Sequence, residues 1–144
     1  MDFRINNYEF GERPSVTIPS PIFFEYLKEE GIRDMVSKHY DLLSQSSIKH
    51  LFPSEPEDLE VAKQHSADFF IQISGGPAYF NQSRGKPMLA SRHAAFKINQ
   101  EARLVWLKCY KEVLTSLNLP EAVAQTFWNY INVFSNWMVN TPSR

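Results

Sequence analysis

Apolar side chains recur at helical spacing along most of the chain after residue 20, and this pattern restricts the fold more strongly than any other sequence feature. Between 120 and 138, for example, Phe127, Ile131 and Phe134 fall on one helix face. No stretch shows the alternation of a half-buried strand. The sequence therefore predicts an all-α fold, with helices from Pro21 to Gly31, from Ile32 to Leu43, from about 54 to 74, from Asn99 to Leu114 and from Pro120 to Met138.

Several helix ends carry local signals. Ser20, which precedes a proline, is a predicted N-cap, and Asn99 is a second one. Ser54 and Glu57 have the spacing of a capping box at the start of the third helix. The run Gly75-Gly76-Pro77 should end that helix. Residues 77–98 are then predicted to form a loop with one short helix.

Length and charge narrow the class of protein. The 144 residues suit one domain, which we expect to cover 21–144 after an irregular arm at 1–20 that could dock on the body. The net charge of −1, with both signs interspersed, gives no indication of nucleic acid or an anionic membrane as partner. Cys109 has no partner for an intrachain disulfide, and no apolar run reaches transmembrane length. We therefore expect a soluble cytoplasmic protein.

Common catalytic motifs are missing from the sequence. No pair of its four histidines has the surroundings of a zinc-binding helix. The Gly75-Gly76 pair ends a helix, whereas a phosphate-binding loop would open one. No serine has the flanking residues of a nucleophile elbow.

His93 is the most informative single residue. It lies between a glycine-punctuated loop and the helix that begins at Asn99, so its ring should be held at one angle. Axial ligation of a haem iron by a neutral imidazole needs such presentation, and Leu89 and Phe96 offer apolar contacts to a flat ring. Arg92 could pair with a haem propionate. The alternatives are a buried histidine bonded to a backbone carbonyl and a solvated surface arginine.

A family resemblance raises the weight of the haem interpretation. It rests on four motifs, which follow one another along the chain: Gly75-Gly76-Pro77, Lys86-Pro87-Met88-Leu89, Arg92-His93-Ala94-Ala95-Phe96 and Trp106. They occur in the order of the group II truncated haemoglobins, which the sequence resembles over about residues 21–140. The resemblance implies a two-over-two helical sandwich, here with an N-terminal extension, and haem b held by His93 as the sole proximal ligand. The chain departs from the family at Ala95, where relatives have proline, and at Glu30-Gly31, where relatives have Gly-Gly.

The same resemblance implies a distal ligand site. Tyr40 and Trp106 would donate hydrogen bonds to bound dioxygen, whose oxygen atoms carry partial negative charge. Both could instead be ordinary aromatic core residues. The tyrosine follows His39, where relatives have an aromatic residue. Further predicted pocket residues are Phe52, Phe69, Ala62 at the usual place of a distal histidine, and Ser66 as a weak extra donor. His65 neighbours this face and is expected at the surface or near a propionate.

Together, these residues and the family resemblance predict a haem-binding globin that binds dioxygen and other diatomic ligands. Tight retention of bound oxygen would suit redox or detoxification chemistry better than oxygen transport. Such chemistry would act on oxygen, nitric oxide or peroxide and would need an electron donor, which is unidentified. Whether the protein is an enzyme stays open, as does a monomer or homodimer. The main alternative is a haem-based sensor or interaction module, in which the arm or the His50 region meets a partner. A haem-free helical protein is the third possibility.

Overall fold

The computed structural model describes residues 2–142, so the first residue of the predicted arm and the last two of the predicted domain lie outside it. Residues 2–142 contain no strand, which confirms the all-α prediction. No helix in this range combines the length and the apolar character needed to cross a membrane. The elements are α1 (Pro21–Leu43), the 3₁₀ helix η1 (Lys49–Leu51), α2 (Pro56–Ile73), α3 (Tyr79–Arg84), α4 (Leu89–Arg92), α5 (Gln100–Ser116) and α6 (Glu121–Trp137).

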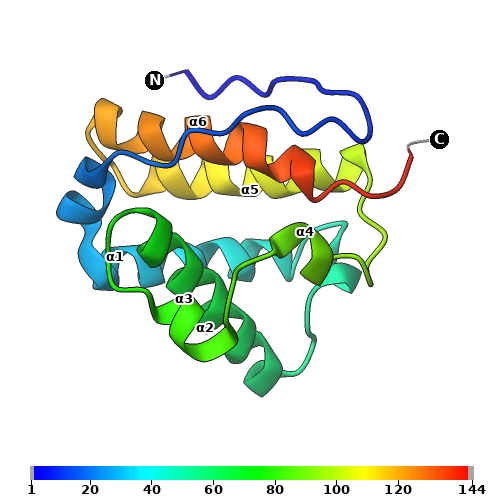
Figure 1. Ribbon diagram of the computed structural model, residues 1–144, viewed down its shortest axis with the longest axis horizontal. Coiled ribbons are helices and arrows are strands. Elements are labelled where there is room, and N and C mark those ends of the chain that lie inside the picture. Colours follow the sequence, from blue (N-terminus) through cyan, green and yellow to red (C-terminus); the bar gives the residue numbers. More distant parts are fainter. Residues whose placement is uncertain (1, 143–144) are drawn as a thin grey trace.

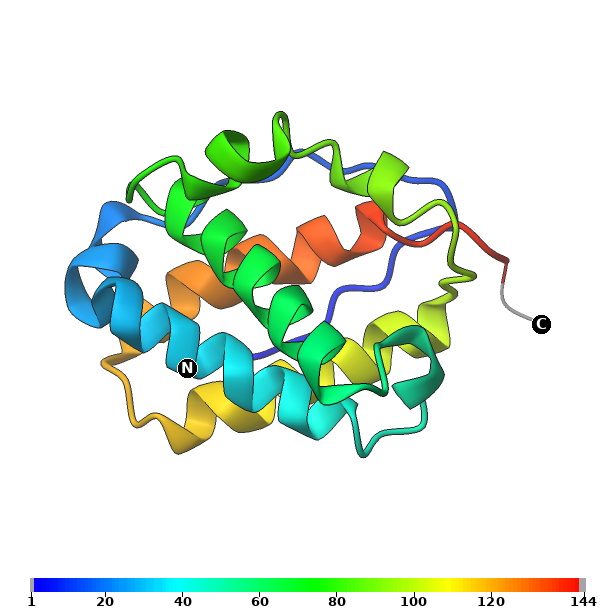
Figure 2. The same ribbon diagram turned by 90° about the horizontal axis from the view of Figure 1, so that it is seen from below.

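The four long helices form two stacked pairs. Figure 1 shows α5 and α6 above α1 and α2, and in Figure 2 the α1/α2 pair lies in front. The core between the pairs comes from the predicted apolar stripes. The rings of Phe23 and Phe127, for instance, stack with centroids 4.7 Å apart and are fully buried, as are Leu107 and Ile131. Burial of these stripes is the main force that stacks the helix pairs.

The break in the first helical region lies at a different residue from the predicted one. Gly31 was expected to end a short helix, but it is helical, and the break falls at Lys28, whose φ is 60° and ψ is −178°. Gly31 supplies space instead of a helix end, because a Cβ there would lie 2.8 Å from Cβ of Leu27. The prediction was wrong because a glycine needed for close approach looks, in sequence, like one needed for a helix end.

The predicted caps have mixed outcomes. The side chain of Ser20 accepts a hydrogen bond from the amide of Ile22, and that of Asn99 accepts one from Ala102 at 2.9 Å, so both predicted N-caps are confirmed. The predicted capping box at the start of α2 is wrong. Glu55 occupies the N-cap without a side-chain bond, and Pro56 begins the helix with its φ already suited to the first turn.

The arm at residues 2–19 has no helix and lies along α6, on the side away from α1 and α2 (Figure 1). Tryptophans of α6 hold it: Nε1 of Trp128 donates to the carbonyl of Arg4 at 2.9 Å, and Nε1 of Trp137 donates to that of Pro14 at 2.8 Å. The ring of Phe3 packs against Trp128 at 5.1 Å. The arm therefore docks on the body, as expected.

Candidate functional site

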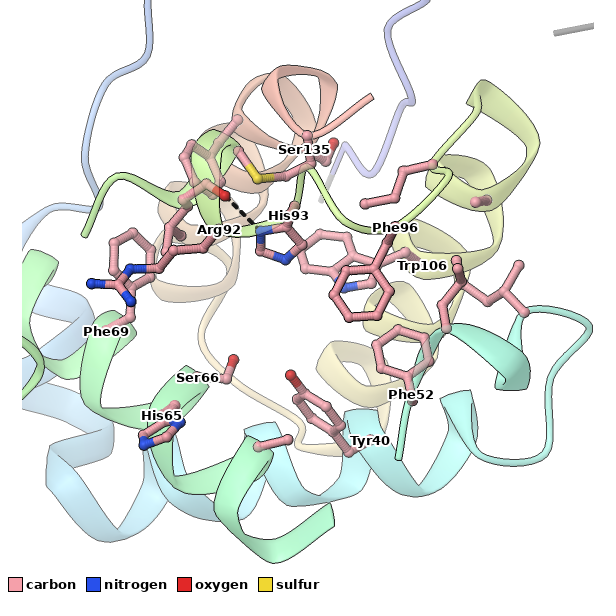
Figure 3. Close-up of a pocket in the computed structure, with 18 of the residues that line it drawn as sticks. Tyr40, Phe52, His65, Ser66, Phe69, Arg92, His93, Phe96, Trp106 and Ser135 are labelled. Carbon is pink, nitrogen blue, oxygen red and sulfur yellow. Dashed lines mark hydrogen bonds between the residues drawn. The ribbon is translucent and has the colours of Figure 1, made fainter. Parts of the chain in front are cut away.

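A cavity of about 400 Å³ opens between the two helix pairs and the α3–α4 segment. All ten predicted site residues line it, although they come from four helices and two connections. Figure 3 shows several of their side chains around a common space. The ten are Tyr40, Phe52, Ala62, Ser66, Phe69, Leu89, Arg92, His93, Phe96 and Trp106.

His93 follows the last residue of the short helix α4, and its ring points into the cavity (Figure 3). Its Nδ1 lies 2.7 Å from the carbonyl oxygen of Leu89. A carbonyl can only accept, so Nδ1 carries the proton and Nε2 keeps a free lone pair. A structural histidine would make the same bond. Histidines that ligate a metal also make it, because it fixes the orientation of the ring.

The loop that carries His93 is secured by the C-terminal segment. Nδ2 of Asn140 donates to the carbonyl of Phe96 at 2.8 Å and to that of His93 at 3.2 Å. The Oδ1 atom of the same side chain accepts from the amide of Ile98 at 2.9 Å. Asn140 was not predicted, because nothing in the sequence connects it with a loop more than 40 residues away.

Arg92 lines the cavity, but most of its donors serve the preceding loop. Its Nε donates to the carbonyl of Pro87 at 2.7 Å, and its Nη2 donates to those of Arg84 and Lys86 at 2.7 and 3.0 Å. The guanidinium also lies over the ring of Phe80. Among the hydrogen bonds found within residues 2–142, none uses Nη1, which leaves this nitrogen for the predicted propionate contact. Arg92 therefore chiefly shapes the loop before His93.

Tyr40 and Ser66 approach the cavity from the side opposite His93, with their hydroxyl groups directed into it (Figure 3). Burial raises the pKa of the Tyr40 phenol, and a hydrogen bond from Ser66 offsets part of that rise. The phenol therefore stays protonated at neutral pH and can donate. The ring of Tyr40 meets that of Phe52 edge-on, with centroids 5.6 Å apart.

Trp106 of α5 forms another wall of the cavity. No hydrogen bond found within residues 2–142 occupies its indole N–H, which leaves that donor available to a ligand. The rest of the lining is largely aromatic or aliphatic, including Phe69, Phe80 and Phe134. Such walls accept a flat apolar group and exclude water.

Two cavity-lining arginines were not predicted. Nη1 of Arg84 donates to Nδ1 of His65 at 2.6 Å. Burial and the charge of Arg84 lower the pKa of His65, which keeps this histidine a neutral acceptor. Arg103 is buried, donates from Nε to Ser135 at 2.9 Å and from Nη1 to the carbonyl of Asn6 in the arm at 3.0 Å. A charged residue within the apolar face of α5 was the one available signal for it.

The residues of this cavity fit a haem. The Nε2 lone pair of His93 suits an iron ligand, and the aromatic walls suit a porphyrin. Comparison with known proteins agrees: residues 23–140 match the bacterial-like globin family. The chain belongs to this family. Its fold is the two-over-two helical sandwich of the truncated globins, as predicted.

Individual relatives narrow the placement within the globins. The group 2 truncated haemoglobin YjbI of Bacillus subtilis is 29% identical over 118 residues, covering 81% of this globin and 87% of the relative. The structure of the present globin is similar to the crystal structure of phosphate-bound Hell's gate globin IV, with a TM-score of 0.90 and 34% identity. The match covers 96% of this chain and 87% of that one. The truncated oxygen-avid haemoglobin from Bacillus subtilis gives a TM-score of 0.77 with 27% identity, covering 82% and 98%. The resemblance to group II truncated haemoglobins is thereby confirmed, and haem-based oxygen binding follows from the family.

Proposed function

We propose that this globin holds haem b through Nε2 of His93 and retains dioxygen with hydrogen bonds from Tyr40 and Trp106. The observation that carries the proposal is the arrangement across the cavity. His93, with its Nδ1 bonded to Leu89, faces the hydroxyl of Tyr40, and the indole of Trp106 lies beside the space between them.

The haem, when bound, supplies an iron that ligates diatomic gases and exchanges single electrons. The chain supplies the surroundings. The carbonyl of Leu89 keeps the imidazole of His93 in one tautomer and orientation. Phe52 and Phe69 exclude water from the cavity, so that hydrogen bonds inside it gain strength. Tyr40 and Trp106 donate to whichever atom of the gas carries negative charge.

Tight retention favours redox or detoxification chemistry of oxygen, nitric oxide or peroxide over oxygen transport. Two strong donors, each worth roughly 1–3 kcal/mol to a partly charged ligand, slow its escape. The Bacillus subtilis relative is itself described as oxygen-avid, which supports the same property here. Turnover would need an electron donor that delivers single electrons to the haem edge.

A haem-based sensor is a second candidate, and one contact favours it. Arg103 lines the cavity and also donates to the backbone of Asn6 in the arm. A change at the cavity could therefore reach the arm, which we treat as an addition (1–20) to the globin domain (21–144).

Absorption spectroscopy tests the proposal directly. The purified ferrous protein should show a Soret band that shifts when carbon monoxide is added. With a reductant present, the oxygen-bound protein should consume nitric oxide over many cycles. A purified protein that shows no haem spectrum after haem is supplied would refute the proposal. Haem binding with a single stoichiometric reaction would favour the sensor instead.

A further inference from the structure

His39 is a buried polar residue that does not line the cavity. It lies on α1 directly before Tyr40, and only 1% of its surface is exposed. Its Nε2 lies 3.0 Å from the backbone carbonyl oxygen of Trp106, on the neighbouring helix α5. Because a carbonyl only accepts, Nε2 carries the proton and donates. His39 therefore connects the helix of Tyr40 with the backbone of Trp106.

The ring of His39 makes two further contacts with α5. It meets the indole of Trp106 edge-on, with centroids 5.0 Å apart and an interplanar angle of 90°. It also stacks on the ring of Tyr110 at 3.4 Å and 16°. Tyr110 in turn lies against Trp106, with centroids 4.9 Å apart. The indole of Trp106 is thus bounded by two rings, and its backbone is held by a hydrogen bond.

Packing alone does not explain a histidine at this position. The carbonyl of Trp106 lies within α5, so it already accepts the helical hydrogen bond from the amide four residues later. A phenylalanine would fill similar space without the cost of burying an imidazole. Burial lowers the pKa of His39 to about 3, so the ring is neutral at physiological pH and needs no counter-ion. What the histidine adds is a directional bond between the two helices.

We propose that His39 is a positioning residue that fixes the direction of the Trp106 indole N–H in the cavity. Tyr40 is the next residue on α1, so this contact joins the backbone of Trp106 to the helix that carries the other predicted gas-binding donor. The inference rests on the proposed function, because it assigns Trp106 a ligand to which it donates. His39 itself does not touch that ligand.

Two substitutions separate positioning from packing. His39→Phe keeps a ring of similar size and removes the donor, whereas His39→Gln keeps an amide donor near the place of Nε2. In His39→Phe the oxygen off-rate should rise about five-fold or more, the effect of weakening one hydrogen bond to the ligand. In His39→Gln it should stay within about two-fold of the wild type. The control is Tyr110→Phe, which keeps the stacked ring and removes a buried hydroxyl without a hydrogen-bond partner among residues 2–142.

A double variant tests whether His39 acts through Trp106. If it does, His39→Phe should add less than about two-fold to the off-rate of Trp106→Phe. Full additivity, or an unchanged off-rate in His39→Phe alone, would overturn the proposal. Both results would be measured in proteins whose spectra with carbon monoxide show intact haem binding.

Nuclear magnetic resonance gives a readout that does not depend on the off-rates. The indole N–H signal of Trp106 in the carbon monoxide complex, assigned by its loss in Trp106→Phe, should shift in His39→Phe and return toward its original position in His39→Gln. An unchanged signal in His39→Phe would overturn the positioning role. A shifted signal together with an oxygen off-rate insensitive to Trp106→Phe would instead refute the proposed donor role of Trp106.

Discussion

Nδ1 of His93 donates a hydrogen bond to the carbonyl oxygen of Leu89 across 2.7 Å. The bond spans one helical turn and joins His93, the residue after α4, to the first residue of that helix. It decides which ring nitrogen is free, so a four-residue helix that is too short to be stable alone controls the chemistry of the cavity.

Removing the imidazole should release the haem. His93→Gly is expected to lose stable haem retention, because no other side chain in the described part of the cavity presents a free imidazole lone pair in the place of Nε2. Added imidazole should restore the Soret band by entering the vacated space. A variant that keeps the native band without imidazole would show that another residue holds the iron.

Removing single distal donors should accelerate oxygen release. Tyr40→Phe keeps the ring and deletes the hydroxyl, so the oxygen off-rate should rise roughly ten-fold if about 1.4 kcal/mol is lost. Trp106→Phe should act in the same direction. The double variant should be non-additive, because both donors serve one small ligand. Carbon monoxide is less polar when bound, and its off-rate should change less.

Stopped-flow measurement of both gases checks this prediction. Oxygen off-rates within about two-fold of the wild type in both single variants would mean that another group retains the ligand. Ser66 would then be the next candidate, since its hydroxyl also faces the cavity (Figure 3).

Stability should depend on the haem. An empty cavity of about 400 Å³ deprives Phe52, Phe69, Leu89 and Phe96 of contacts on one side. A ligand present at a thousand times its Kd adds about 4 kcal/mol, which for this size raises Tm by about 10 °C. Calorimetry of the apoprotein and holoprotein should show this difference. Equal melting temperatures would contradict a haem buried in the core.

The stability of the fold should decrease in mild acid because of His39. Burial lowers the pKa of His39 in the folded state to about 3, below the ordinary value of 6.5. Between these values the unfolded chain binds a proton that the folded chain does not, so the free energy of unfolding falls as pH falls. From about pH 6.5 to 5, the wild type should lose about 1–2 kcal/mol more than His39→Phe.

Urea unfolding of both proteins at the two pH values measures this difference. His65, whose pKa is also lowered, is present in both proteins and cancels in the comparison. Parallel pH profiles for wild type and His39→Phe would show that His39 titrates normally.

The sequence was sufficient where the determining interactions are local. Ser20 and Asn99 cap their helices through residues two or three positions away, and helix faces follow from spacing alone. The place of His93 could be predicted because a contiguous motif carries it, and the other nine predicted cavity residues lie on faces or motifs of the same kind.

Only the tertiary structure decided where the first helical region breaks and which hydrogen bonds Arg92, Asn140 and His39 form. Gly31 could not be distinguished from a helix stop until the nearby side chain of Leu27 was in place. Arg92 uses most of its donors on the loop before it, and Asn140 secures the His93 loop from the other end of the chain. The bond from His39 to Trp106 joins residues 67 positions apart. Sequence spacing determines which face of a helix a side chain occupies, but its hydrogen-bond partner depends on which helix packs there, and that is set by burial of the whole core.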